Sequence, residues 1–310
     1  MKKVLITGGE GFIGSYLCRC LEEKGHEITI VGRNLTPDEK KIKLDLSNLD
    51  SQDELTRGYD VVIHLASMLV IDEAANRPKE TITNNVNATL NLLENVRINN
   101  PQCLFILASS DKIYGNPSSE VVSERDQGIP IEPYGYSKLN SELLVQLYHH
   151  LYRINYLIIR SGNVFGLNLN LKLFIPAVMS QIAQGKDVIE VGNLDSFRNF
   201  IYVEDLVVAY AAGVENLQAK NNTFNINAYH KQISEVTQEI TLSARKLLDK
   251  DIIFSQIEEK KRPISLETRP FQMDCTKAKN ILMWQPKFLF SEAIEKTLNS
   301  YLSHVRRTGL

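Results

Sequence analysis

A glycine-rich segment near the start of the 310-residue chain constrains the fold more than any other feature. TGGEGFIG (residues 7–14) follows a short apolar run, KVLIT, and precedes an amphipathic stretch, GSYLCRCLEEKG. Gly8 permits a tight turn, Gly11 lets a pyrophosphate approach the backbone, and Gly14 lets the following helix pack closely on a sheet. This strand–turn–helix context predicts a dinucleotide-binding βαβ unit.

The rest of the first half alternates β-branched runs with amphipathic stretches. Strands are expected at residues 3–7, 27–32, 59–67, 102–110 and 155–161, and helices at 14–25, 86–99 and 137–152. Alternation of this kind predicts a parallel sheet with helices on both faces, which is a Rossmann-type, doubly wound α/β domain.

After about residue 165 the alternation weakens. Helices are expected at 171–186, 233–249 and 290–305, a strand leading into a helix at 198–216, and a short strand at 223–228. We therefore expect residues 1–165 with 198–230 to form the dinucleotide-binding domain. Residues 166–197 with 231–310 are expected to form a smaller, interleaved C-terminal lobe.

Composition narrows the compatible classes of protein. Hydrophobic residues make up 43% of the chain and charged residues 23%, which is ordinary for a globular protein. The net charge of -2 gives no electrostatic case for nucleic acid or an acidic membrane. No apolar run has the length of a membrane span or a signal peptide, so a cytoplasmic location is expected. The four cysteines form no CxxC or Cys/His cluster, so no metal site is predicted.

The end of the second predicted strand bears on the choice of dinucleotide. NAD-binding folds of this type usually carry an acid there, which binds the adenosine ribose hydroxyls. Here the strand runs ITIVGRN, with Gly32 and Arg33 in place of an acid. Because an arginine can bind the 2′-phosphate of NADP, the sequence slightly favours NADP over NAD. A merely solvated Arg33 would leave both dinucleotides open.

The stretch PYGYSK (residues 133–138) places Tyr134 one helical turn before Lys138. A free tyrosine has a pKa of about 10 and is a poor base at neutral pH. A neighbouring ammonium would lower that pKa, and the phenol could then accept a proton from a hydroxyl while hydride leaves the same carbon. Tyr136 lacks this spacing. Taken alone, such a pair is usually a surface contact.

Together, these motifs resemble those of the extended short-chain dehydrogenases/reductases, in the branch of nucleotide-sugar epimerases and dehydratases. The similar segments are TGGEGFIG, HLAS (64–67), NNVNATLNLLE (84–94), SSDKIYG (109–115), YGYSK (134–138), RSGNVFG (160–166), RNFIYVEDL (198–206) and RPFQMDCTKAKNILMWQPKF (269–288). They occur in the family's order over nearly the whole chain. The resemblance implies an NAD(P)-dependent enzyme for a nucleotide-diphosphate sugar, which the C-terminal lobe would bind, and it is compatible with a homodimer.

The resemblance also assigns roles to particular residues. Ser110, Tyr134 and Lys138 would be catalytic, with Ser110 hydrogen-bonded to the reacting oxygen. Cofactor contacts are implied for Gly8, Gly11, Phe12, Ile13, Gly14, Arg33, Asp45, Leu46, Leu65, Ala66, Asn85, Tyr134 and Lys138. Substrate contacts are implied for Ser110, Asn163, Arg198 and Arg269, the two arginines meeting the diphosphate. The segment after Arg269 departs from the family's pattern at Asp274 and Met283, which leaves the base and sugar specificity open.

Asp111 and Lys112 distinguish between reaction types. Epimerases and reductases of this family commonly have small or neutral residues there, whereas 4,6-dehydratases place an acid and a base. An acid can protonate the leaving hydroxyl at C6, and a neutral lysine can remove the C5 proton. Alternatively, Asp111 only caps a turn beside a solvated Lys112.

The first hypothesis is therefore hydride transfer at C4 of a nucleotide-diphosphate hexose, by an epimerase or a 4-keto-sugar reductase. The alternative is a 4,6-dehydratase that uses Asp111 and Lys112. A remote alternative is a non-catalytic regulator that senses NADP(H). Such relatives generally lose the tyrosine or the lysine, whereas Tyr134 and Lys138 are both present.

Overall fold

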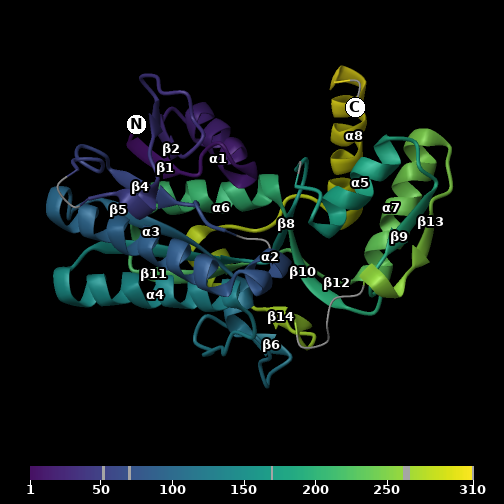
Figure 1. Cartoon of the computed structure of the whole chain (residues 1–310). Coiled ribbons are helices and arrows are strands. Elements are labelled where there is room, and N and C mark those ends of the chain that lie inside the picture. Colours follow the sequence, from purple (N-terminus) through teal and green to yellow (C-terminus); the bar gives the residue numbers. More distant parts are fainter. Residues whose placement is uncertain (51–52, 69–70, 169, 261–265, 309–310) are drawn as a thin grey trace.

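A seven-stranded parallel sheet forms the centre of the computed structural model, which describes residues 1–310 except 51–52, 69–70, 169, 261–265 and 309–310 (Figure 1). The strand order is β11-β7-β5-β4-β1-β2-β3. The strands are β1 (Lys3–Thr7), β2 (Glu27–Gly32), β3 (Lys41–Lys43), β4 (Val61–His64), β5 (Leu104–Ser110), β7 (Asn155–Ser161) and β11 (Asn222–Ile226). The predicted Rossmann-type, doubly wound fold is thereby confirmed.

Helices cover both faces of this sheet, because its strands carry apolar side chains on both sides. Val4 of β1 belongs to a buried cluster with Leu17 of α1 (Phe12–Glu23) and Leu206 of α6 (Val203–Glu215). Leu5, on the opposite face, belongs to a second cluster that includes Leu92 of α3 (Pro78–Asn99) and residues of α4 (Pro133–Tyr152). This two-sided burial accounts for the continuous apolar runs in the sequence.

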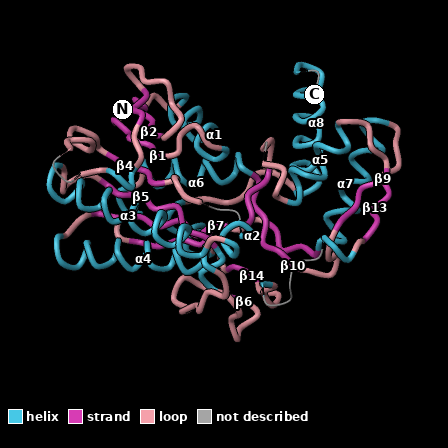
Figure 2. Tube along the Cα trace, viewed as in Figure 1, coloured by secondary structure: helices cyan, strands magenta, loops and turns pink. Residues whose placement is uncertain are grey.

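The remaining elements gather mainly beside the carboxyl ends of the central strands (Figure 2). A three-stranded sheet of β12 (Tyr229–Gln232), β10 (Phe197–Tyr202) and β8 (Asn163–Phe165) leads to a smaller lobe. That lobe contains α5 (Phe174–Ala183), α7 (Ile233–Leu248), α8 (Phe290–Thr308) and the paired strands β9 (Val188–Val191) and β13 (Ile253–Gln256). The short elements are α2 (Ile71–Asn76), β6 (Val121–Val122), β14 (Gln272–Met273), 3-10 turns at Leu46–Asn48, Asp111–Tyr114, Leu217–Ala219 and Glu258–Lys260, and a π turn at Ala278–Leu282.

Two helices begin earlier than the periodicity predicts. The helix expected at 86–99 begins at Pro78, and the helix expected at 137–152 begins at Pro133. In both cases a proline occupies the first helical turn, where its missing N–H costs nothing. The earlier start of α4 brings Tyr134 into a helix.

The proposed domain boundaries remain a prediction. Within the segment assigned to the C-terminal lobe, β14 pairs with β6, which belongs to the segment assigned to the dinucleotide-binding domain. In the part of the chain that the structure describes, none of the helices combines the length and apolar character that crossing a bilayer requires.

The sheet topology determines where a ligand can bind. β1 lies between β4 and β2, so the chain leaves β1 toward one side and later returns to the other. In doubly wound sheets, ligands bind beyond the carboxyl ends of the strands at such a switch point. The glycine loop follows β1, and Ser110 ends β5, which is two strands away.

Candidate active site

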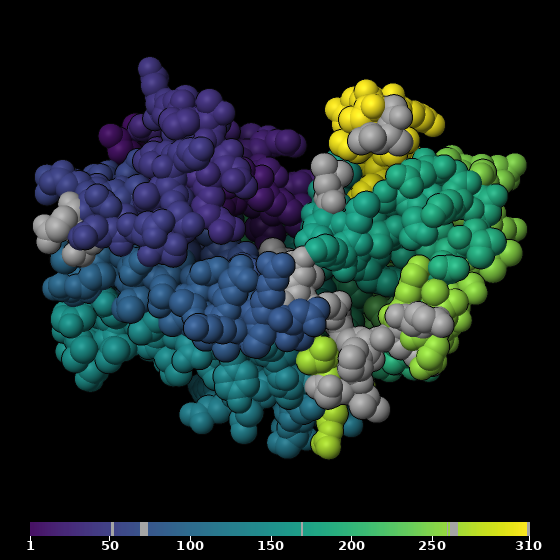
Figure 3. All heavy atoms as spheres, viewed as in Figure 1, coloured from purple at the N-terminus to yellow at the C-terminus, as the bar shows by residue number. Residues whose placement is uncertain are grey.

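A cleft of about 1060 Å³ lies between the carboxyl ends of the central strands and the smaller lobe. The surface is hollowed between these two parts of the molecule (Figure 3). Most of the predicted site residues line this cleft: Gly8, Gly11, Phe12, Ile13, Gly14, Leu65, Ala66, Ser110, Asp111, Lys112, Tyr134, Lys138, Asn163 and Arg198. Residues from six separate motifs thus meet in one place.

The glycine loop has the shape that a dinucleotide requires. Gly8 has a φ of 71°, and a Cβ added there would lie 3.0 Å from the backbone nitrogen of Ala66. A Cβ on Gly14 would lie 2.3 Å from the carbonyl oxygen of Gly8, so both positions require glycine. Among the described residues, no side chain caps α1, so its first N–H groups can bind an anion. The residues present therefore fit a pyrophosphate at this loop.

Four of the predicted cofactor residues lie outside the lining of the cleft: Arg33, Asp45, Leu46 and Asn85. Arg33 is exposed, and Asp45 accepts hydrogen bonds from the backbone nitrogen and hydroxyl of Ser47. Asn85 donates to the hydroxyl of Ser137 at 2.8 Å and accepts from the nitrogen of Met68. In the described structure Asn85 thus joins the segment after β4 to α4, which is a positioning role.

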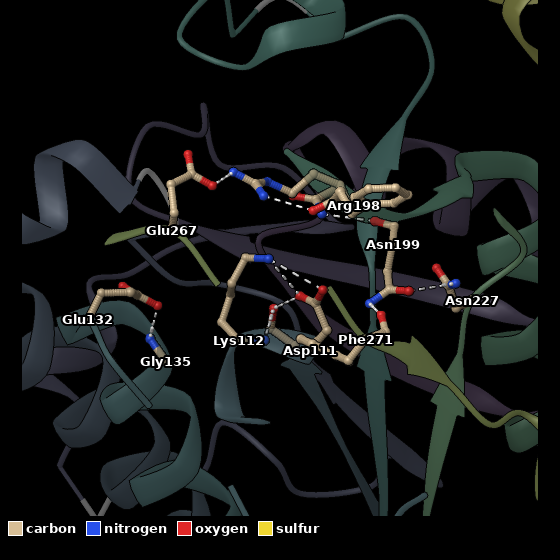
Figure 4. Close-up of polar contacts among 12 residues, drawn as sticks. Asp111, Lys112, Glu132, Gly135, Arg198, Asn199, Asn227, Glu267 and Phe271 are labelled. Carbon is tan, nitrogen blue, oxygen red and sulfur yellow. Dashed lines mark hydrogen bonds and ion pairs between the residues drawn. The ribbon is translucent and has the colours of Figure 1, made fainter. Parts of the chain in front are cut away.

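Glu132 positions the start of α4. Its carboxylate oxygens accept hydrogen bonds from the backbone nitrogens of Tyr134 at 2.7 Å and Gly135 at 2.6 Å (Figure 4). A Cβ on Gly135 would lie 2.7 Å from the carbonyl oxygen of Lys112, so the helix start packs directly on the turn after Ser110. The sequence analysis missed Glu132. An acid directly before a proline that starts a helix is the pattern that indicates it.

In the cleft wall, Lys138 is buried and Tyr134 is half-buried. The ammonium of Lys138 lies 5.7 Å from the centroid of the Tyr134 ring and donates to the carbonyl oxygen of Ala108 at 2.8 Å. Burial lowers the pKa of Lys138 to about 8, although the Glu142 carboxylate opposes this shift. The amine of Lys138 is therefore less fully protonated near neutral pH than the amine of an exposed lysine.

The pKa of Tyr134 differs from the expectation based on Lys138 alone. Burial raises the pKa of the phenol above its usual value, and the carboxylates of Glu132 and Asp111 raise it further, while a hydrogen bond with Ser110 lowers it. The expected lowering considered one neighbour and neglected desolvation, which is the larger effect. The polypeptide's own groups thus favour the phenol form of Tyr134, which is the proton-donating form, over the phenolate.

Asp111 and Lys112 form an ion pair inside the cleft (Figure 4). The Lys112 ammonium lies 3.2 Å from a carboxylate oxygen of Asp111, and the two side chains are 11% and 3% exposed. The Ser110 hydroxyl donates to the same carboxylate at 3.2 Å. A solvated Lys112 therefore does not describe this site, because its side chain is nearly buried beside Ser110.

The predicted substrate residues separate into two groups. Asn163 and Arg198 line the cleft, and Asn163 donates to the carbonyl oxygen of Asn199 at 2.8 Å. Arg198 forms an ion pair with Glu267, another residue of the cleft that the sequence analysis missed (Figure 4). Arg269 is exposed and lies outside the cleft lining, so the structure does not bring it to the predicted diphosphate position.

Comparison with known proteins agrees with this arrangement. The model of the NAD dependent epimerase/dehydratase family matches residues 4–227. A dTDP-glucose 4,6-dehydratase of Haemophilus influenzae is 26% identical over 97% of this chain and 98% of its own length. A UDP-N-acetyl-alpha-D-glucosaminuronate decarboxylase of Bacillus cytotoxicus is 28% identical, over 96% of this chain and 97% of the relative. Among solved structures, a UDP-N-acetylglucosamine 4-epimerase from Methanobrevibacter ruminantium superposes with a TM-score of 0.84 and 26% identity, over 98% of this chain and 99% of the other.

Proposed function

Because the chain belongs to the NAD dependent epimerase/dehydratase family, we propose that it transfers hydride at C4 of a nucleotide-diphosphate hexose, as an epimerase or a 4-keto-sugar reductase. The observation that carries the proposal is that Ser110, Tyr134 and Lys138 line the same cleft as the glycine loop and Arg198. The named substrates of the relatives, which are nucleotide sugars, support this substrate class.

In the proposed mechanism, the glycine loop, Tyr134 and Lys138 would hold a nicotinamide dinucleotide, which would supply the hydride acceptor and donor. The hydroxyl of Ser110 forms a hydrogen bond with the C4 oxygen of the sugar. The phenolate form of Tyr134 would take the C4 hydroxyl proton as hydride leaves C4, which requires that Tyr134 first lose its own proton. The resulting phenol would return a proton to this oxygen when the 4-keto sugar is reduced. Burial and the two carboxylates raise the pKa of Tyr134 and so favour the phenol, which is the proton donor in the second of these transfers.

The reaction type is tested by the mass of the product. The purified protein is incubated with a panel of nucleotide sugars, with and without NADPH or NADH. An epimerase leaves the mass unchanged, a dehydratase removes one water, and a reductase adds two hydrogens to a 4-keto sugar. Absence of any change in mass or stereochemistry across the panel would contradict the proposal, and would leave the non-catalytic regulator as the better description.

A 4,6-dehydratase is the second candidate, because the Asp111–Lys112 pair lies within the cleft beside Ser110. Dehydration would use the acid and the amine at C6 and C5, which hydride transfer at C4 does not need. We expect Lys112→Ala to slow dehydration by about a hundredfold or more while changing epimerisation or reduction much less. Lys260→Ala, which removes another lysine of the cleft, is the control. An equal effect of both substitutions on dehydration would contradict a role for Lys112 in that reaction.

A homodimer is the proposed assembly, since α4 presents an apolar stripe to solvent. Tyr136, Leu143, Leu147 and Leu151 recur at helical spacing and are 44–55% exposed. An exposed apolar stripe of this kind is typical of a helix that packs against a partner.

We expect Leu147→Glu to convert the dimer to a monomer, because the substitution places a charge in the apolar contact. Sedimentation velocity measures the change. Leu242→Glu on α7, where the leucine is 56% exposed, is the matched control and should leave the mass unchanged. A monomeric wild-type protein, or a dimer that Leu147→Glu leaves intact, would contradict this interface.

A further inference from the structure

The carboxylate of Glu10 lies on Gly32, the residue that ends β2. A Cβ placed on Gly32 would lie 2.0 Å from Oε1 and 2.5 Å from Oε2 of Glu10. A side chain at position 32 would therefore have to displace this carboxylate from its present position. Glu10 occupies the space that the side chain of a strand-end acid would otherwise fill, although it comes from the glycine loop after β1.

The loop is attached to β2, which determines where Glu10 points. The backbone nitrogen of Gly8 donates to the carbonyl oxygen of Val31 at 2.8 Å. A Cβ on Gly9 would lie 2.4 Å from Cγ2 of Ile30, so the loop backbone lies directly on the side chains of β2. With Gly8 and Gly9 held in this way, the glutamate at position 10 extends over the carboxyl end of the strand. Its side chain is exposed and accepts no hydrogen bond from the described residues, so a ligand can reach its carboxylate.

In dinucleotide-binding folds, a carboxylate at the end of the second strand accepts hydrogen bonds from the adenosine ribose hydroxyls. We infer that Glu10 supplies this carboxylate here and selects NAD over NADP, an inference that rests on the proposed NAD(P)-dependent function. A ribose with free hydroxyls can donate to Glu10. A 2′-phosphate would instead bring a second anion to the same place, where like charges repel.

Arg33 does not restore a site for the 2′-phosphate. Arg33 and Glu10 are both exposed, so exposure does not distinguish them. The positive charge of Arg33, however, acts on Asp45, whose carboxyl pKa is lowered by hydrogen bonds from Ser47 and, to a smaller extent, by Arg33. The carboxylate of Asp45 therefore already interacts with Arg33, and the carboxylate of Glu10 adds a second negative charge near the end of β2. The expected cofactor preference is the opposite of the one that Arg33 alone predicts.

The test is the affinity of the full-length protein for NAD⁺ and NADP⁺, measured by isothermal titration calorimetry without substrate. We expect the wild type to bind NAD⁺ at least about tenfold more tightly than NADP⁺. Glu10→Gln should weaken NAD⁺ binding by about tenfold and strengthen NADP⁺ binding, because it removes the charge and keeps the length of the side chain. Glu23→Gln, an exposed glutamate on α1, is the matched control and should change neither affinity.

A double substitution tests whether the position of the carboxylate at the end of β2 is what matters. Glu10→Ala should weaken NAD⁺ binding, whereas Glu10→Ala combined with Gly32→Asp, which supplies a carboxylate from the strand end itself, should restore tight NAD⁺ binding. A wild type that prefers NADP⁺, or an affinity ratio that Glu10→Gln leaves unchanged, would overturn this inference alone. Binding of neither dinucleotide would overturn the proposed function together with it.

Discussion

Tyr134→Phe is expected to lower kcat by about 10²–10⁴-fold while leaving the affinity for the nicotinamide dinucleotide unchanged. The substitution removes only the phenol oxygen, which carries the proton to and from the sugar, and keeps the ring that lines the cleft. Turnover of the substrate found in the panel measures the first effect, and calorimetric titration with the dinucleotide measures the second.

Tyr136→Phe provides the control for this experiment. Tyr136 lies two residues away on the same helix, but its side chain is 44% exposed and does not line the cleft. Its substitution should leave kcat within about twofold of the wild type, as for other exposed positions away from a site. Wild-type turnover by Tyr134→Phe would contradict the proposed proton transfer, whichever sugar is the substrate.

Arg160→Met is expected to lower the free energy of unfolding by about 3–5 kcal/mol. The guanidinium is buried and forms hydrogen bonds with Glu142 at 2.7 Å and with the hydroxyl of Tyr114 at 2.9 Å. Removing it leaves the Glu142 carboxylate buried without its partner. Urea unfolding followed by circular dichroism measures the difference.

Two further variants test whether the loss of stability comes from the burial of the Arg160–Glu142 pair or would follow the loss of any ion pair. Arg57→Met breaks the pair with Glu54, in which both side chains are more than half exposed, and should change stability much less. Arg160→Met combined with Glu142→Leu removes the uncompensated charge and should recover part of the loss. If the exposed and buried substitutions cost the same, burial is not the source of the effect.

The central fold could be predicted because its determinants are local. Strands β1, β2 and β7 begin and end where the apolar runs do, since period and turn chemistry act over a few residues. The predicted bounds were less accurate for elements whose position depends on contacts with other parts of the chain. The start of α4 depends on Glu132, and the short strand β3 pairs with β2 although its three residues carry little pattern of their own.

The candidate site could be predicted only in part, for the same reason. The residues that share a cleft were those in contiguous motifs, such as the glycine loop and the Tyr134–Lys138 pair. Arg269 resembled a diphosphate arginine by its place in a motif, yet the fold leaves it exposed. Glu267 was missed because its partner, Arg198, lies 69 residues away in the chain.

The sequence by itself determined the parallel sheet, the glycine cradle and the identity of the tyrosine–lysine pair, because backbone sterics and side-chain period act between near neighbours. The tertiary structure alone decided the direction in which the pKa of Tyr134 shifts, the burial of the Asp111–Lys112 pair and the position of Glu10 against Gly32. These three depend on desolvation and on contacts between separate elements, which become defined only when the chain is packed.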